Sequence, residues 1–313
     1  DALRRTPLLP TEELLWDELR VPPSDATTKR GDADSALGTS GALSLPKLGL
    51  QFLTPHDLIA RPMHLFRLEA AYGIRADIVD AVRRSQPVKR VEHDESGNPV
   101  SHTVFRGWSR KALPIADFNI VHIGPPEIGD SHPSKVIANL EVDLSAYAPS
   151  IRKEWDSLRE HDVLFLVALR PPATSSSKKP TSSSSRRPRP DAEDCTFAQR
   201  MGVVRVRGAV VLSILDEEGI DFNSPFAEEK PSTGGDGEEF HHPRTLVPRG
   251  PVPPKGLKRT IRLALDPAQY ALDISESKRT SDLDAFGRGS LVVRRDGKDN
   301  NFRAVLSAAG DAI

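Results

Sequence analysis

One uninterrupted run of apolar residues limits the possible folds of this chain more than any other feature of its sequence. Residues Val163 to Leu169 read VLFLVAL, and Pro171 and Pro172 follow almost at once. The run is far shorter than the ~20 apolar residues that a helix needs to cross a bilayer. A short segment that is apolar at every position, and that prolines end, is typical of a buried β-strand. The sequence therefore predicts a fully buried strand here.

Several other segments have the composition of strands. Along residues 138–144 (ANLEVDL), apolar residues alternate with polar ones, which is the pattern of a half-buried strand. Six or more short strands joined mostly by turns and loops predict an antiparallel barrel or sandwich. We expect the further strands at Val104–Phe105, Ile115–Ile123, Val136–Leu144, Thr260–Leu265 and Leu291–Arg295, and a strand pair, Val203–Val206 and Ala209–Leu215, bent at Gly208.

Helical segments precede, interrupt and follow the strands. Thr54 is a natural N-cap and Pro55 a natural first helical residue, and apolar residues at helical spacing continue to about Arg84. Pro62 and Gly73 predict a kink in this long helix or its division into two. The other expected helices are 8–19, which Thr11 can cap, Ala148–Glu160, where Ile151, Trp155 and Leu158 share one face, and a helix that starts at Asn300 or Asn301.

Long polar segments interrupt the predicted core. Only 37% of the 313 residues are hydrophobic, and the chain has 27 prolines. The segment 174–190 (TSSSKKPTSSSSRRPRP) has five basic residues and almost no apolar surface, so we expect it to be disordered or weakly ordered. We expect the same of 22–44 and of Asn223–Lys255. The net charge of −1 provides no global attraction to nucleic acid or membrane. The single cysteine, Cys195, excludes a disulfide framework.

Motifs for nucleotide binding, nucleophilic catalysis and metal binding are missing from the sequence. It contains no GxxxxGK[ST], GxGxxG or GxSxG string. Zinc requires several Cys or His ligands at short spacing, and the pair His241-His242 does not supply them. We therefore predict no cofactor and no metal in this segment.

The cluster Glu160-His161-Asp162 has side chains that are suited to acid–base chemistry. Adjacent residues on a strand point to opposite faces, so His161 and Asp162 would not converge on one substrate. A histidine at a helix end instead suits the negative end of the helix dipole. We interpret the cluster as a helix end that leads into a strand, and we predict no catalytic residue.

A tryptophan among basic residues is the best candidate for nucleic-acid contact. Trp108 lies beside Arg106, Arg110 and Lys111 in the string FRGWSRKA. Such a ring can stack on a base, but only where it is exposed. A tryptophan in the core or an interface, surrounded by solvated arginines, is the favoured alternative. The polar insertion offers further candidate phosphate contacts, although such insertions are more often solvated loops. These are Lys178, Lys179, Arg186, Arg187 and Arg189.

Longer strings resemble one protein family over nearly the whole chain outside 22–44, 173–199 and 223–256. In order, they are PTEELLWDE, LPKLGLQFLTPHDLIARPMHLFRLEAAYGIRADI, FRGWSRKALPIADFNI, IRKEWDSLREHDVLFLVALRP, MGVVRVRGAVV, LDPAQYALDI and NNFRAVL. They resemble the middle of the Aquarius family, the intron-binding RNA helicases of the spliceosome. The insertions differ from those of animal members and suggest a fungal relative.

The resemblance implies a superfamily 1 helicase related to the nonsense-mediated-decay helicase, in which a β-barrel sits on two antiparallel stalk helices. We therefore expect an α+β fold, with an antiparallel β-barrel of about six strands on long stalk helices and disordered polar insertions. The expected divisions are a helix and loop from a helical-repeat domain (1–53), an incoming stalk helix (54–90), the barrel (91–299, with insertions at 173–199 and 223–256) and the start of an outgoing stalk helix (300–313).

Expectations about activity also come from the resemblance. It implies a nuclear, ATP-dependent RNA helicase that acts in pre-mRNA splicing and binds the intron near the branch region. ATP and Mg would bind RecA-like domains outside this segment. The implied partners are the U2 particle, a helical-repeat scaffold protein and a nuclear cyclophilin. No binding to a membrane is expected. Two roles remain open for the segment itself, because its barrel can position RNA or can dock proteins as a scaffold.

Overall fold

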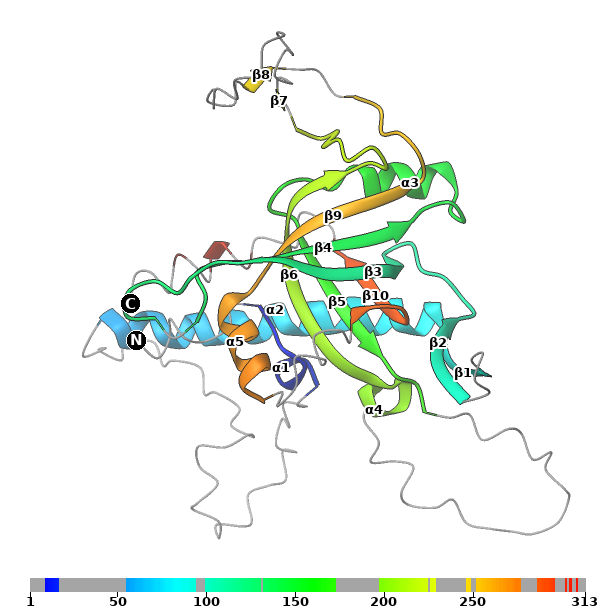
Figure 1. The fold of residues 1–313 in the computed structure, drawn as a ribbon. Helices are drawn as coiled ribbons and strands as arrows, with labels where there is room; N and C mark the ends of the chain where they lie inside the picture. Colours follow the sequence, from blue (N-terminus) through cyan, green and yellow to red (C-terminus); the bar gives the residue numbers. More distant parts are fainter. Residues whose placement is uncertain are drawn as a thin grey trace, which may run out of the picture.

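Six strands of this chain close into an antiparallel barrel (Figure 1). The computed structural model describes residues 9–16, 55–93, 99–130, 132–172, 197–224, 226–228, 246–248, 252–276 and 286–295, with 302, 304, 305 and 308. Around the barrel the order is β10-β3-β4-β9-β6-β5, so the predicted barrel of about six strands is confirmed. The strands are β3 (Ala112–Ile123), β4 (Val136–Asp143), β5 (Val163–Leu169), β6 (Val203–Leu215), β9 (Lys258–Leu265) and β10 (Ser290–Arg294).

Strand β5 is buried along its whole length, as its sequence predicts. Its alternate side chains enter two different hydrophobic clusters. Leu164 and Leu166 belong to the cluster that fills the barrel. Phe165 and Val167 belong to a second cluster, between the outside of the barrel and the helices packed on it. An apolar residue is therefore needed at every position, because neither face of β5 meets water.

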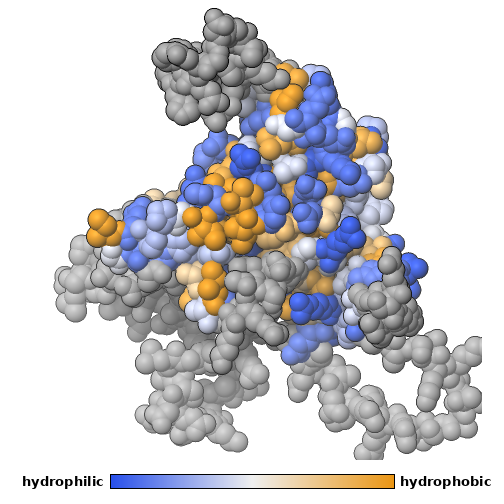
Figure 2. Space-filling model, in the orientation of Figure 1, coloured by the Kyte–Doolittle hydropathy of each residue, from blue (hydrophilic) through white to orange (hydrophobic). Residues whose placement is uncertain are grey.

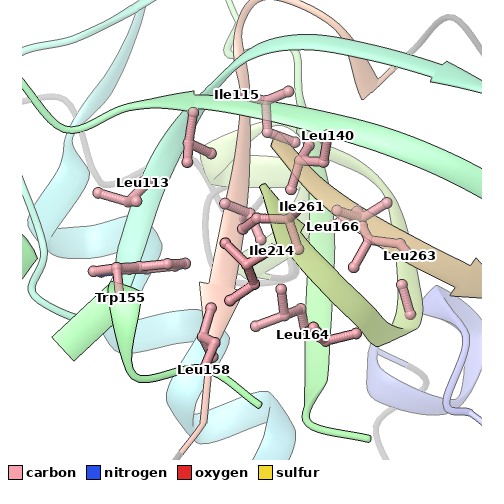
Figure 3. Close-up of a cluster of buried hydrophobic side chains, with 14 of the residues drawn as sticks. Leu113, Ile115, Leu140, Trp155, Leu158, Leu164, Leu166, Ile214, Ile261 and Leu263 are labelled. Atoms are coloured by element: carbon pink, nitrogen blue, oxygen red, sulfur yellow. The ribbon is translucent and has the colours of Figure 1, made fainter. Parts of the chain in front are cut away.

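Helix α3 (Pro149–Asp156) and the turn after it pack onto the barrel interior. Ile151, Trp155 and Leu158 are buried there, which confirms the predicted face. Figure 3 shows Trp155 and Leu158 among the side chains of this cluster. The indole Nε1 of Trp155 donates a hydrogen bond to the backbone oxygen of Arg110, at 3.3 Å. The helix is shorter than predicted and ends at Asp156 rather than Glu160.

Helix α2 (Pro55–Ser85) is one uninterrupted helix of 31 residues, so the predicted alternative of two helices in series is wrong. Its apolar stripe, including Ile74 and Ile78, packs on the outside of the barrel. Gly73 lies where a side chain would crowd Arg295, because a Cβ there would be 3.2 Å from the Arg295 guanidinium. The Nε of Arg295 donates to Asp77 at 2.8 Å, which joins α2 to the end of β10.

Smaller elements surround the barrel. Short helices are α1 (Glu12–Trp16), α4 (Phe197–Met201) and α5 (Pro267–Glu276), and the separate hairpins are β1 (Pro87–His93) with β2 (Pro99–Phe105) and β7 (Phe226–Glu228) with β8 (Leu246–Pro248). Phe302, Ala304, Val305 and Ala308 are helical, whereas the proposed caps Thr54, Asn300 and Asn301 lie outside the described residues. Among the described helices, none has the length and apolar character needed to cross a membrane.

One local prediction is wrong, and one helix was not predicted. The segment 203–215 is a single strand, β6, rather than a pair bent at Gly208. Gly208 instead leaves room for Leu9, since a Cβ at this glycine would lie 2.8 Å from the Leu9 side chain. Helix α5 was not predicted at all. It is held by a buried ion pair between Asp273 of α5 and Arg207 of β6, and Arg207 also pairs with Glu12 of α1.

Asp216, just after β6, organises the loops at one end of the barrel. Its carboxylate accepts hydrogen bonds from the backbone N–H groups of Glu218 (3.0 Å), Ile220 (2.9 Å) and Lys255 (3.1 Å). Burial alone would raise the pKa of Asp216, but these hydrogen bonds and the nearby charge of Arg259 outweigh burial and lower that pKa.

A pH dependence of stability follows for Asp216. Because its pKa is lower in the folded than in the unfolded chain, its stabilising contribution is complete above the ordinary value of 3.8. It is lost as the pH falls through the lower folded value. In the wild type, the free energy of unfolding should fall as the pH is lowered from 5 into the acid range. We expect a smaller fall in Asp216→Asn, and urea denaturation across that range measures the difference. An equal acid dependence in the variant and the wild type would contradict this assignment.

Candidate nucleic-acid interface

The segment that carries Trp108 connects β2 to β3 and is fastened to the C-terminal end of α2. The backbone N–H of Arg106 donates to Gln86 O at 3.3 Å, and that of Gly107 donates to Ser85 O at 3.1 Å. Gly107 has no room for a side chain, because a Cβ there would overlap the backbone carbonyl of Arg84. The position of Trp108 is thus determined by the end of a long, packed helix.

Trp108 is 61% exposed, so the prediction of a tryptophan in the core is wrong, whereas the other half of that alternative, a tryptophan in an interface, stays a prediction. The hydrogen bonds of this segment to α2 are made by its backbone, and the indole ring is left at the surface. Arg106 is also exposed. The arrangement satisfies the condition that stacking imposes, which is an open aromatic face beside a cation.

The other two candidates in this segment are engaged in ion pairs. Arg110 pairs with Glu154 of α3, and its Nε lies 2.7 Å from the carboxylate. The hydrogen bond from Arg110 lowers the pKa of Glu154. Lys111 pairs with Asp77 of α2, with its Nζ 3.2 Å from the carboxylate. These two cations connect β3 to neighbouring helices, so their charges are already partly neutralised.

The remaining basic, cysteine and histidine candidates from the sequence lie outside the residues that the structure describes. Lys178, Lys179, Arg186, Arg187 and Arg189 lie outside the described residues, as do Cys195, His241 and His242. Among the residues that the structure describes, no three His, Cys, Asp or Glu side chains are grouped as metal ligands would be.

The cluster Glu160-His161-Asp162 forms a turn before β5. His161 has a φ of +74° and a side chain that is 77% exposed, and it is not at the end of α3. The predicted interaction with a helix dipole is therefore wrong. The backbone N–H of His161 donates to Val211 O at 2.9 Å, and Asp162 O accepts from Val211 N at 2.8 Å. These bonds extend the pairing of β5 with β6, which is a structural role.

A second basic and aromatic surface was not identified from the sequence. We call it the α2 groove, and it is lined by Trp16, Tyr72, Arg75, Ala76, Val79, Arg83 and Phe197. Five of these residues lie at helical spacing on α2, which is the only signal that the sequence contains. The other two come from α1 and α4, and only the folded chain brings these helices to α2.

Comparisons with known proteins agree on one family. The family model described as "Intron-binding protein aquarius, beta-barrel" matches residues 93–295, a range that contains all six barrel strands. The mouse (Mus musculus) protein RNA helicase aquarius is 35% identical over 307 residues, which are 97% of this chain and 17% of the mouse protein. The chain thus spans about a sixth of the length of that relative.

Proposed function

This chain belongs to the Aquarius family of RNA helicases, and we propose that it is the stalk and β-barrel portion of a helicase that acts in pre-mRNA splicing. In this proposal the full protein works in the nucleus and binds the intron near the branch region. It hydrolyses ATP with Mg in RecA-like domains outside this segment, and it assembles with the U2 particle, a helical-repeat scaffold and a nuclear cyclophilin. The barrel segment positions the RNA.

The exposed Trp108 beside Arg106 is the observation that carries a role in RNA contact. Stacking of one base on an aromatic ring contributes about 1–3 kcal/mol, and it does not depend on base identity. An arginine next to the ring adds attraction to the phosphates. Because the segment is fastened to α2, the ring needs little reorganisation when a base binds. Arg110 and Lys111 support this site by fixing β3 to α3 and α2.

Replacing both groups tests the proposal. We expect Trp108→Ala combined with Arg106→Glu in the full-length protein to weaken binding of a labelled single-stranded oligouridine by about tenfold or more, since a stacking contact and a phosphate contact are lost. The measurement is fluorescence anisotropy over a series of salt concentrations. The variant should also show a smaller dependence of affinity on salt, by about one unit of log–log slope per lost phosphate contact.

The matched control is Ile123→Ala combined with Lys135→Glu, on the extension of β3 and β4. Both residues are exposed, so the control removes a surface apolar group and reverses a charge, as the test variant does. We expect it to bind oligouridine as the wild type does. If the Trp108 variant and the control bind equally well, Trp108 and Arg106 do not contact RNA.

An exposed apolar surface favours a second candidate function, in which the barrel docks proteins. Val121, Ile123 and Ile128 lie on the extension of β3 and β4, and they are 55%, 50% and fully exposed. Figure 2 shows apolar patches (orange) on this side of the molecule, over that extension and over α5. Apolar docking weakens little with added salt, whereas phosphate contacts weaken steeply. Binding of a partner protein should therefore persist at salt concentrations that abolish oligouridine binding, and this difference separates the two functions.

A further inference from the structure

The α2 groove combines three aromatic rings with two arginines. Tyr72, Arg75 and Arg83 come from one side of α2, Trp16 is the last residue of α1, and Phe197 is the first residue of α4. From Tyr72 to Arg83 the helix rises by about 16 Å, at ~1.5 Å per residue. That length corresponds to roughly five residues of extended chain, or to two or three nucleotides.

Two of the three aromatic rings in the groove are in contact. The rings of Trp16 and Phe197 are 5.7 Å apart and tilted by 32°. The guanidinium of Arg83 lies over the Phe197 ring, 5.4 Å from its centre, so a cation–π contact holds this arginine at the groove. Tyr72 is 72% exposed, so it presents an open face on which a base can stack.

The charge of the groove favours an electron-rich partner. None of the seven lining residues is acidic, and the described part of the chain provides no ion pair for Arg75 or Arg83. The indole Nε1 of Trp16 is buried and, within the same part of the chain, has no hydrogen-bond partner. A buried donor without an acceptor costs about 1–3 kcal/mol.

The chain adds further positive charge close to the groove in sequence. The five basic residues of 174–190 precede Phe197, and the last of them, Arg189, is eight residues away. An extended connection of this length reaches at most about 28 Å. Three acidic residues, Asp191, Glu193 and Asp194, lie between, which leaves a net excess of two positive charges in this stretch. In sequence, the stretch that leads into Phe197 is therefore basic, which favours a negatively charged ligand.

We propose that the α2 groove binds single-stranded RNA, with a base on Tyr72 and phosphates at Arg75 and Arg83. The inference rests on the proposed function in assuming that this segment contacts RNA, but it assigns a second site. The groove and Trp108 lie on different sides of α2. Lys111, three residues from Trp108, pairs with Asp77, which is roughly 140° around the helix from Tyr72 at ~100° per residue. Two separate sites, one on α2 and one on the β2–β3 connection fastened to its end, hold a strand at two points.

Single substitutions in the full-length protein test this site. We expect Tyr72→Ala and Arg75→Gln each to weaken oligouridine binding by about fivefold to tenfold in fluorescence anisotropy. Tyr72→Phe keeps the ring and should bind as the wild type does. Arg84→Gln is the matched control for charge, because Arg84 is another arginine of α2 but pairs with Asp80 at 2.8 Å. Arg75→Gln, unlike Arg84→Gln, should lower the salt slope by about 0.7.

Tryptophan fluorescence gives an independent readout. In a Trp108→Phe background, oligouridine should quench part of the tryptophan emission, and the further substitution Trp16→Phe should reduce that quenching. Wild-type affinity in both Tyr72→Ala and Arg75→Gln would overturn the inference. So would unchanged oligouridine binding in variants that no longer bind an acidic polyglutamate peptide, since the groove would then be a peptide site. Loss of binding only in the Trp108 variant would leave the proposed function standing and remove the second site. Loss only in the groove variants would do the reverse for the Trp108 site.

Discussion

Replacement of Trp155 with alanine is expected to lower the free energy of unfolding by about 3–5 kcal/mol, the usual cost of removing a large buried aromatic side chain. Trp155 is 2% exposed and belongs to the cluster that fills the barrel, together with Leu158 and Leu113. Its loss would leave a cavity between α3 and the barrel, and it would remove the hydrogen bond to the Arg110 carbonyl. Urea denaturation followed by far-ultraviolet circular dichroism measures the change.

A second tryptophan provides the control for that measurement. Trp108→Ala makes the same chemical change at a position that is 61% exposed, so its effect should stay within about 0.5 kcal/mol. The comparison also removes any general effect of losing a tryptophan from the unfolded chain. Similar destabilisation by the two substitutions would show that Trp155 does not pack as the structure describes.

Removal of Asp273 is expected to have an effect of comparable size for an electrostatic reason. Asp273 and Arg207 are almost fully buried, and the Nε of Arg207 lies 2.7 Å from the Asp273 carboxylate. Asp273→Ala leaves a buried guanidinium whose remaining acidic partner, among the residues that the structure describes, is Glu12. Breaking one side of a buried pair costs about 3–5 kcal/mol, because the remaining charge is desolvated without full compensation. Thermal or urea unfolding of the variant measures this cost.

Two further variants show whether burial or charge explains the cost of removing Asp273. Asp80→Ala removes the partner of Arg84 in an exposed pair, which should change stability by less than about 1 kcal/mol. The double variant Arg207→Met with Asp273→Leu replaces both charges by apolar groups, and it should be markedly more stable than Asp273→Ala alone. If the double variant is as unstable as the single one, packing rather than the unpaired charge explains the loss.

The barrel was predictable because its strands carry their own pattern. The unbroken run at 163–169 and the alternation along 138–144 each report how many faces of a strand are buried, which is a local property. Helix α5 was missed because its residues are not distinctively helical, and it is stabilised by an ion pair with Arg207, which is 66 residues earlier. The end of α3 was placed too late because a turn at 157–162, rather than a helix–strand junction, precedes β5.

The candidate sites show the same division between local and tertiary information. The sequence identified Trp108 and its basic neighbours, but exposure decides whether a tryptophan stacks or packs, and exposure depends on how the β2–β3 connection meets α2. The partners of Arg110 and Lys111 come from α3 and α2, so their neutralisation was not visible either. The α2 groove needs Trp16, Tyr72 and Phe197 together, which are spread over 182 positions.

Strand β5 has a mechanical consequence that follows from its two buried faces. Leu164, Leu166 and Ala168 help to fill the barrel, whereas the other four residues of β5 lie in the outer cluster with Ile74 and Ile78 of α2. Sliding α2 along the barrel would therefore open the outer cluster. At ~1.5 Å per residue, the 31 residues of α2 form a rod about 46 Å long. A force applied to the far end of α2 would therefore reach the barrel through the contacts that α2 makes with β5 in the outer cluster.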